Sequence, residues 1–139
     1  MIWSVRFHVK FELEFDRLVQ EVQDEMLAHV TLLQRFGPQL GRPRVDTLKG
    51  SRHANMKELR FDATDGVWRV AFAFDPNRDA ILLACGDKSG RSEPEFYRQL
   101  IRKADERFDR HLAYLKAQKQ ELEKSKRRAD LKVRKKGQP

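Results

Sequence analysis

The sequence predicts an α+β fold class: a small antiparallel sheet, formed by an N-terminal strand and a C-terminal three-stranded meander, packed with N-terminal helices and a C-terminal helix. Two stretches, residues 11–36 and residues 94–115, have apolar residues at helical spacing. Between them, three apolar strand-like runs are separated by two short turn signals. One compact group of strands flanked by long helical stretches is typical of an α+β domain.

The N-terminal part is predicted to begin as a strand and to continue as helix. Residues 2–7 alternate apolar and polar side chains, the pattern of a half-buried strand. In residues 11–36 the apolar spacing predicts one long helix or two consecutive helices. Gly37-Pro38 ends this stretch, because glycine suits a helix C-cap and proline cannot continue a helix. Residues 37–55, with two prolines and three glycines, are expected to be mostly loop.

The meander follows from three strands and two turns. Residues 56–61 are its first strand, and Asp65-Gly66 is a hairpin turn signal. Residues 67–74 alternate, so Arg69 is expected on the face opposite the aromatic row that includes Trp68 and Phe72. A turn at residues 75–78 then leads to residues 80–85, which are nearly all apolar and read as a central strand.

The C-terminal helix begins near Pro94, which fits a first helical turn. Its apolar stripe is made of Tyr97, Leu100, Ile101, Ala104, Phe108, Leu112 and Leu115. Beyond Leu115 the apolar positions become sparse and lysines and arginines dominate. We therefore expect a folded domain over residues 1–115 and a basic, partly helical or disordered tail over residues 116–139.

The positive charge of the chain is unevenly distributed. The 139 residues have a formal net charge of +8. Residues 116–139 contain ten Lys or Arg and three Asp or Glu, whereas residues 1–115 contain nineteen and eighteen. The body is nearly neutral but polarised, since residues 11–25 are acidic and residues 42–60 are basic. A local positive patch of this kind attracts phosphate.

Several classes of chemistry have no support in the sequence. The four histidines are scattered, and the chain has no Cys/His cluster, P-loop or GxSxG motif, so no metal or other cofactor is expected. No apolar run is long enough for a membrane helix, and the N-terminus lacks a signal-peptide pattern, which favours the cytoplasm. Cys85 lies in an apolar run and is read as a small core residue.

A set of cations around the predicted sheet fits the cleavage of an RNA backbone. In that reaction a 2′-hydroxyl attacks the adjacent phosphate, and fixed cations stabilise the dianionic phosphorane without a metal. The sheet-held candidates are Lys57, Arg60, Arg69 and Lys88, with Tyr97 at the start of the following helix. Two residues are candidates for the proton acceptor: His53, because histidine as a residue type suits proton transfer near neutral pH, and Lys57, although a lysine base requires a large downward pKa shift. Arg42, Arg44, Lys49 and Arg52 form a basic loop suited to bind RNA.

Each candidate also has a structural interpretation. Arg69 fits an exposed face of the sheet, and Arg60 fits an ion pair with Glu58 or with the acidic helix. Lys88 fits an ordinary loop lysine, and Tyr97 fits the end of the core stripe. The basic loop and the tail fit solvated surface charge.

The order of elements and four sequence segments resemble the RelE/ParE superfamily of bacterial type II toxin–antitoxin systems, and within it the HigB-like, phage-derived branch. The segments are FDRLVQEVQ, LLQRFGPQLGRPRVDTLKGSRHANMKELRF, GVWRVAFAFDPNRDAILLACGDKS and EFYRQLIRKADERF. The most specific features are the succession KELR, WRV, apolar run and GDKS, and the helix exit RFGPQLGRP. The resemblance covers about residues 2–115.

The resemblance implies a RelE-like microbial ribonuclease-type fold and ribosome-dependent cleavage of mRNA. It places Lys57, Arg60, Arg69 and Lys88 around the scissile phosphate and Tyr97 against a base. Where RelE has a second lysine on its first meander strand, this chain has Glu58. The implied partners are mRNA, the ribosome and a cognate antitoxin, expected to be a helix-turn-helix, HigA-like protein.

Two other functions remain open at this point. ParE-like members of the superfamily poison DNA gyrase, although the set of Arg60, Arg69 and Lys88 favours the ribonuclease branch. A non-catalytic nucleic-acid-binding module would instead depend on the basic tail.

Overall fold

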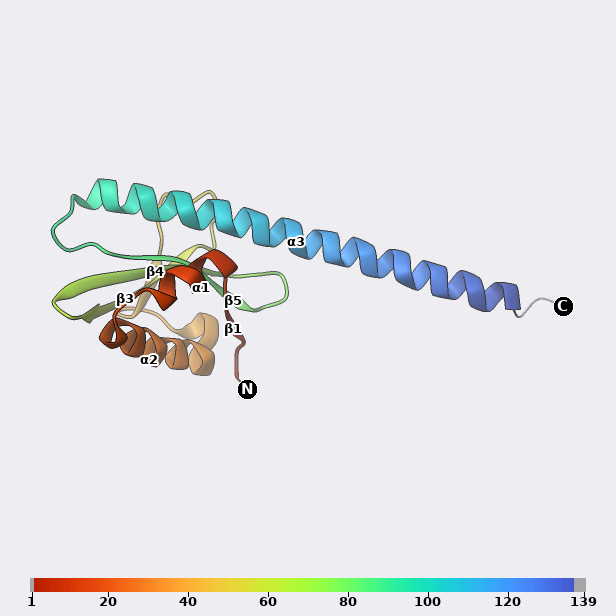
Figure 1. The fold of residues 1–139 in the computed structure, drawn as a ribbon, viewed down its shortest axis with the longest axis horizontal. Helices are drawn as coiled ribbons and strands as arrows, with labels where there is room; N and C mark the ends of the chain where they lie inside the picture. Colours follow the sequence, from red (N-terminus) through yellow and green to blue (C-terminus); the bar gives the residue numbers. More distant parts are fainter. Residues whose placement is uncertain (1, 137–139) are drawn as a thin grey trace. The chain divides into compact units, whose positions relative to one another are not determined.

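The computed structural model describes residues 2–136 of the chain. Within these residues a five-stranded sheet, in the order β1-β5-β4-β3-β2, is combined with three α-helices and one short 3-10 helix (Figure 1). The predicted α+β fold class is confirmed. In chain order the elements are β1 (Val5–Phe7), α1 (Val9–Asp16), α2 (Gln20–Phe36), the 3-10 helix η1 (Gly37–Gln39), β2 (Val45–Thr47), β3 (Lys57–Ala63), β4 (Gly66–Phe74), β5 (Ala80–Asp87) and α3 (Glu93–Lys136).

Two features of the sheet differ from the prediction. β1 pairs with β5 in parallel, with Val5 opposite Ala80, so the sheet is mixed and not wholly antiparallel. β2 lies inside the predicted loop and pairs with β3 in antiparallel fashion. Its three residues are too few to show the alternation by which a strand is recognised in a sequence.

The hairpin between β3 and β4 fixes the register of the sheet. Thr64 and Asp65 have positive φ angles of 50° and 58°, and Ala63 pairs with Gly66. Positive φ at both central residues is what a type I′ connection requires. The turn therefore lies one residue earlier than the predicted Asp65-Gly66, and Gly66 belongs to β4.

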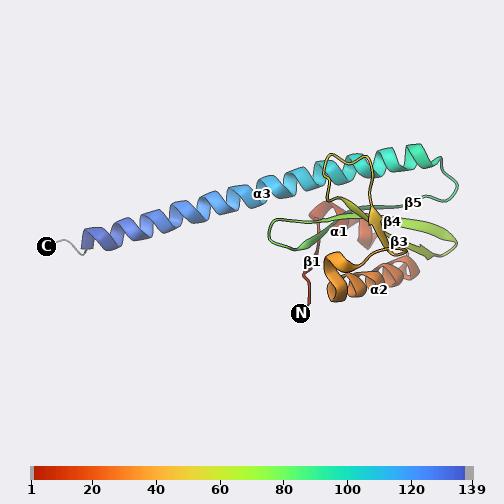
Figure 2. The same ribbon diagram turned by 180° about the vertical axis from the view of Figure 1, so that it is seen from behind.

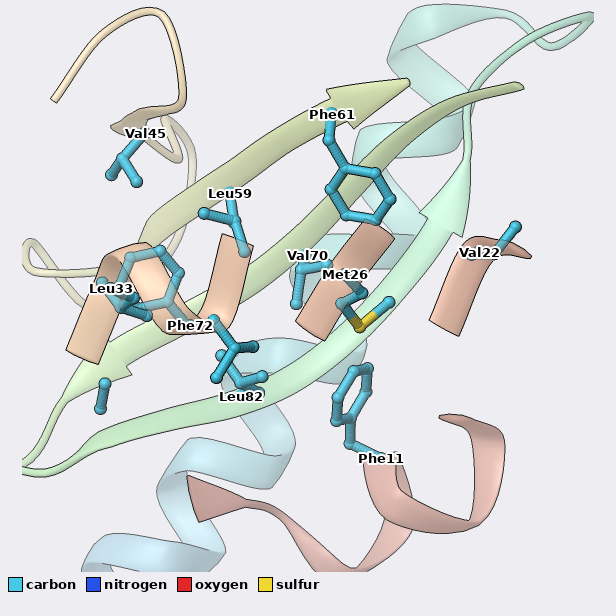
Figure 3. Close-up of a cluster of buried hydrophobic side chains, with 12 residues drawn as sticks. Phe11, Val22, Met26, Leu33, Val45, Leu59, Phe61, Val70, Phe72 and Leu82 are labelled. Carbon is cyan, nitrogen blue, oxygen red and sulfur yellow. The ribbon is translucent and has the colours of Figure 1, made fainter. Parts of the chain in front are cut away.

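One face of the sheet holds the main hydrophobic core. The predicted helical stretch is two helices, α1 and α2, and α2 turns its apolar residues onto β3, β4 and β5. Figure 3 shows this cluster of buried side chains. Its members include Phe11, Val22, Met26, Val30, Leu33, Leu59, Phe61, Val70, Phe72 and Leu82.

The opposite face of the sheet is covered by the first turns of α3. Both ribbon views place α2 and the start of α3 on opposite sides of the sheet (Figures 1 and 2). Phe96, Leu100, Ala104 and Phe108 are buried along α3. The predicted stripe is thus largely correct, but Phe96 was missing from it, and Tyr97 lies beside the core residues with a half-buried side chain.

The chain divides into two compact units between Phe108 and Asp109. The first contains the whole sheet and the start of α3. In the second, residues 109–136 are helical, and they include most of the tail that was expected to be partly helical or disordered. The predicted boundary at residue 115 stays a prediction. Within residues 2–136, no helix is both long enough and apolar enough to cross a membrane.

Candidate functional site

Strands β3 and β4 place two arginines side by side on the face of the sheet that α3 covers. Arg60 and Arg69 are direct Cα partners across the two strands. Their strand neighbours Leu59 and Val70 belong to the main core on the other face. Because successive side chains of a strand point to opposite faces, both guanidinium groups lie on the side away from that core.

A buried carboxylate joins these arginines to the start of α3. Glu58 Oε1 lies 3.3 Å from Arg69 Nε and 3.6 Å from Arg60 Nε. Tyr97 donates its hydroxyl hydrogen to the same oxygen at 3.0 Å and accepts a hydrogen bond from Arg69 Nε at 3.3 Å. We call these four residues the Glu58 cluster: two guanidinium groups and a phenol that all contact one carboxylate.

Burial controls the acid–base properties of this cluster. Glu58 is 6% exposed and Arg69 is 5% exposed. Burial raises the pKa of Glu58 above its ordinary value, although the hydrogen bond from Tyr97 and the charges of Arg69 and Arg60 oppose the shift. Burial likewise raises the pKa of Tyr97, so its phenol keeps its proton. The cluster therefore contains a carboxylate that accepts a proton more readily than an exposed glutamate does.

A glycine on β5 allows α3 to bring Tyr97 to the sheet. Gly86 is the Cα partner of Arg69. A Cβ atom at Gly86 would lie 2.9 Å from Cε1 of Phe96, which is too close for an unstrained contact. The bare backbone at this position thus admits the Phe96 ring, and the next residue along the helix is Tyr97. Neither Gly86 nor Phe96 figured among the predicted site residues.

Two cations make the exposed rim of the cluster. Lys88, just after β5, lies 2.7 Å from Glu93 Oε1, and its Nζ is 5.9 Å from the centroid of the Tyr97 ring. The side chains of Arg60 and Lys88 are 29% and 20% exposed. Arg60 also lies 3.9 Å from Asp46 Oδ2 on β2. An incoming anion would meet Arg60 and Lys88 before it met the buried groups.

Two of the predicted site residues lie elsewhere. Lys57 is three residues from Arg60 on the same strand, so strand alternation places its side chain on the opposite face of the sheet. The His53 ring packs against Phe108 with centroids 4.9 Å apart. Phe108 is eleven residues along α3 from Tyr97, which corresponds to ~16 Å of helix. The structure thus brings together Arg60, Arg69, Lys88 and Tyr97 and separates them from the two predicted proton acceptors.

The predicted RNA-binding loop is exposed, and its later part is anchored to α3. Arg42, Arg44, Lys49 and Arg52 are all exposed at the residue level. Asp105, buried on α3, accepts hydrogen bonds from the Ser51 hydroxyl and from the backbone amide of Arg52. These contacts fix the loop that presents Lys49 and Arg52, while Arg42 lies 3.9 Å from Asp46.

The surroundings of the other reactive side chains indicate structural roles. Among the described residues, His, Cys, Asp and Glu form no group of three or more that could hold a metal ion. Cys85 packs against the main core, and burial raises the pKa of its thiol to about 12. The reading of Cys85 as a core residue agrees with both observations.

Glu58 is the member of the site that sequence reasoning missed, since it was considered only as an ion-pair partner of Arg60. The signal was nevertheless present. Glu58 and Arg60 are two residues apart on one strand, so they share a face.

Comparisons with known proteins come from sequence and from structure. Residues 13–109 match the family described as phage derived protein Gp49-like (DUF891). The chain is 44% identical over 111 residues to "Putative toxin HigB2" and 42% identical over 99 residues to "Putative toxin HigB3", both of Mycobacterium tuberculosis. These alignments cover 79% and 71% of this chain. The chain spans 55% of the length of the first relative and 84% of the second. A free-state structure of a mutant of the E. coli toxin RelE aligns with a TM-score of 0.49 at 12% identity, covering 74% of this chain and 97% of that one.

Proposed function

Because the chain belongs to the phage-derived Gp49-like family, we propose that it is the toxin of a type II toxin–antitoxin system and that its Glu58 cluster cleaves mRNA on the ribosome. The resemblance to the HigB-like branch is confirmed by the family match and by the two relatives. The observation that supports the cleavage chemistry is the convergence of Arg60, Arg69 and Tyr97 on one oxygen of Glu58.

The first step of the proposed reaction is removal of the 2′-hydroxyl proton. Tyr97 is less deeply buried than Glu58 and donates its own hydrogen to Glu58 Oε1. The phenol oxygen takes the proton from the 2′-hydroxyl as the phenol hydrogen passes to Glu58. The raised pKa of Glu58 favours this transfer, because the protonated carboxyl is the form that burial stabilises. His53 and Lys57 are then not needed as proton acceptors.

The second step is displacement at phosphorus. The 2′-oxygen forms a bond to the phosphorus while the bond to the 5′-oxygen breaks, leaving a 2′,3′-cyclic phosphate and a 5′-hydroxyl. Arg60 and Arg69 stabilise the negative charge of the phosphorane as preorganised hydrogen-bond donors. The Lys88 ammonium, beside the Tyr97 ring, donates the proton that the leaving 5′-oxygen needs. No metal takes part in these steps.

The proposed partners are inferred from the cations of the same site. Arg60 and Lys88 form a cationic rim, and the exposed loop that contains Lys49 and Arg52 is anchored further along α3, at Asp105. An antitoxin that silences the toxin would cover this rim with an acidic or helical segment, and a helix-turn-helix protein of the HigA type fits the family. Ribosomal RNA and mRNA would use the same positive surface, in the cytoplasm where ribosomes are found.

Substitution of the cations tests the proposed chemistry. Arg69→Ala and Lys88→Ala should each abolish growth arrest upon induction, since loss of one preorganised donor costs about 10²–10³ in rate. The measurement is growth after induction, with sequencing of mRNA 5′ ends and circular dichroism of the purified variants. Arg102→Ala, an exposed cation on α3 outside the cluster, is the control and should arrest growth as the parent chain does.

A folded Arg69→Ala, Lys88→Ala double variant that still arrests growth would contradict the proposal. Induction of the DNA-damage response without new mRNA ends would point to gyrase as the target.

A further inference from the structure

We propose that residues 116–135 of α3, here called the basic extension, form a second RNA-binding surface that holds the sugar–phosphate backbone without reading its sequence. This inference rests on the proposed function in one respect: RNA is chosen among polyanions because the Glu58 cluster is proposed to act on RNA. The surface itself is argued from the charge and helical geometry of the extension.

The basic extension has a high positive charge and little to neutralise it. It contains nine Lys or Arg and three Asp or Glu. Its twenty helical residues extend for about 30 Å, so the net charge is about one unit per 5 Å. All twenty residues are exposed, and among the described residues none of the nine cations forms an ion pair. An excess of exposed cations along one helix is suited to a row of phosphates.

The cations lie in two rows along the helix. At 100° per residue, Lys116, Lys119, Lys126, Arg127 and Arg134 share one side, and Lys124, Arg128, Lys132 and Lys135 share the neighbouring side. Together the two rows cover about two thirds of the helix circumference. A nucleic-acid backbone can therefore approach the helix from several directions and still contact ammonium or guanidinium groups. Contacts of this kind are made to phosphates and not to bases, so they favour binding that is independent of sequence.

The apolar residues of the extension do not fit a membrane or a helical partner. Three large apolar residues of the extension, Leu122, Leu131 and Val133, are 57%, 52% and 71% exposed. Leu122 and Val133 are eleven residues apart and share a face, whereas Leu131 lies on the opposite face of the helix, between the two rows of cations. A membrane-surface helix needs its apolar residues on one face. A coiled-coil seam through Leu122 would include Ser125 and Lys132 in one heptad register and Lys119 and Lys126 in the other, so each register puts two polar residues in the seam.

The extension is also separate from the domain that contains the Glu58 cluster. The family match ends at residue 109, and the first compact unit ends at Phe108. Both limits precede the basic extension. Replacement of its cations therefore changes no residue of the first compact unit.

Neutralising each row in the full chain tests the inference. One variant changes Lys119, Lys126, Arg127 and Arg134 to Gln, and the other changes Lys124, Arg128, Lys132 and Lys135 to Gln; glutamine keeps nearly the same helix propensity. Affinity for a uridine homopolymer is measured over a series of salt concentrations. If each cation contacts one phosphate, the slope of log K against log salt should fall by about 3 in each variant. The affinity at moderate salt should fall at least about tenfold.

The control variant is Gln120→Ala with Ser125→Ala, which changes two exposed side chains of the same helix and no charge. Circular dichroism verifies that all variants keep their helix. Unchanged affinity and slope in both row variants would overturn the inference. Tighter binding of the parent chain to anionic lipid vesicles than to RNA, lost in the same variants, would also overturn it. Growth arrest by the Arg69→Ala variant is scored separately in cells, so the proposed function and this inference can fail independently.

Discussion

At the scale of single residues, the site depends on a glutamate that sits where a charge is costly. Glu58 is nearly inaccessible to solvent, yet its environment includes two arginines and a phenol. The raised pKa of Glu58 means that burial outweighs these partners. A raised pKa is what the proposed role of Glu58 as a proton acceptor requires.

This balance predicts the pH dependence of stability. The folded protein holds a proton on Glu58 more tightly than the unfolded chain does. Protonation of Glu58 therefore stabilises the folded protein, and this contribution to the free energy of unfolding is fully present below the ordinary pKa of 4.5. It is lost as pH rises through the raised pKa. The free energy of unfolding of the parent chain, relative to that of Glu58→Gln, should therefore fall between about pH 4 and about pH 7.5. Urea unfolding at both pH values measures it, and a difference that grows with pH would contradict the assignment.

Residue-scale prediction from the sequence was partly successful. Arg60, Arg69, Lys88 and Tyr97 were proposed together, and the structure brings them together. Lys57 was grouped with Arg60 although strand alternation already separates residues three apart. His53 could not be placed, because no periodic pattern fixes where a loop residue meets a distant helix. The catalytic roles of all these residues stay predictions.

At the scale of elements, a buried arginine ties α3 to α1 and to the sheet. Arg107 is 7% exposed and makes two hydrogen bonds to the Glu14 carboxylate, at 2.7 Å and 2.8 Å. It also donates to the carbonyl oxygen of Leu83 on β5 at 2.7 Å. The bond from Arg107 holds the pKa of Glu14 below its ordinary value. Three elements thus meet at one guanidinium group.

Removal of this guanidinium should loosen α3. Arg107→Ala is expected to lower the free energy of unfolding by about 2 kcal/mol, because charged hydrogen bonds are lost while half-exposed Glu14 regains water. Denaturant unfolding near neutral pH measures the change. Arg98→Ala, an exposed cation on the same helix, should change stability by less than about 0.5 kcal/mol. Equal effects of the two substitutions would show that Arg107 has no special role.

Element-scale prediction succeeded where the pattern was long. The helical spacing identified α2 and the start of α3, and alternation identified β4. The pattern could not distinguish one N-terminal helix from two, because residues 17–19 interrupt the helix without a proline or glycine. The parallel pairing of β1 with β5 is a long-range contact, and local periodicity contains no information about such pairing.

At the scale of the whole molecule, the two compact units contain different kinds of residue. Every buried residue of the hydrophobic core belongs to the unit that ends at Phe108, within the part of the chain that the structure describes. The second unit contributes charge and helix. The near-neutral body and the strongly basic C-terminal segment were separable in the sequence, because charge is counted residue by residue and needs no three-dimensional information.

This separation predicts the effect of truncation. Deletion of residues 116–139 should leave the thermal midpoint within about 3 °C of that of the full chain, because no core contact is removed. Growth arrest should fall partially and not disappear. Calorimetry and growth after induction measure the two effects, and the full chain with Gln120→Ala and Ser125→Ala is the control. A large drop in the midpoint would show that the tail stabilises the folded body.

The two-residue turn at Thr64 and Asp65 has a consequence for how such a site can be lost. The turn pairs Ala63 with Gly66 and thereby begins the register that puts Arg60 across from Arg69. One inserted or deleted codon there would move one arginine to the other face of the sheet, since side chains alternate with period two. A frame-preserving length change in this turn would therefore separate the two arginines while the gene still encoded every side chain of the Glu58 cluster.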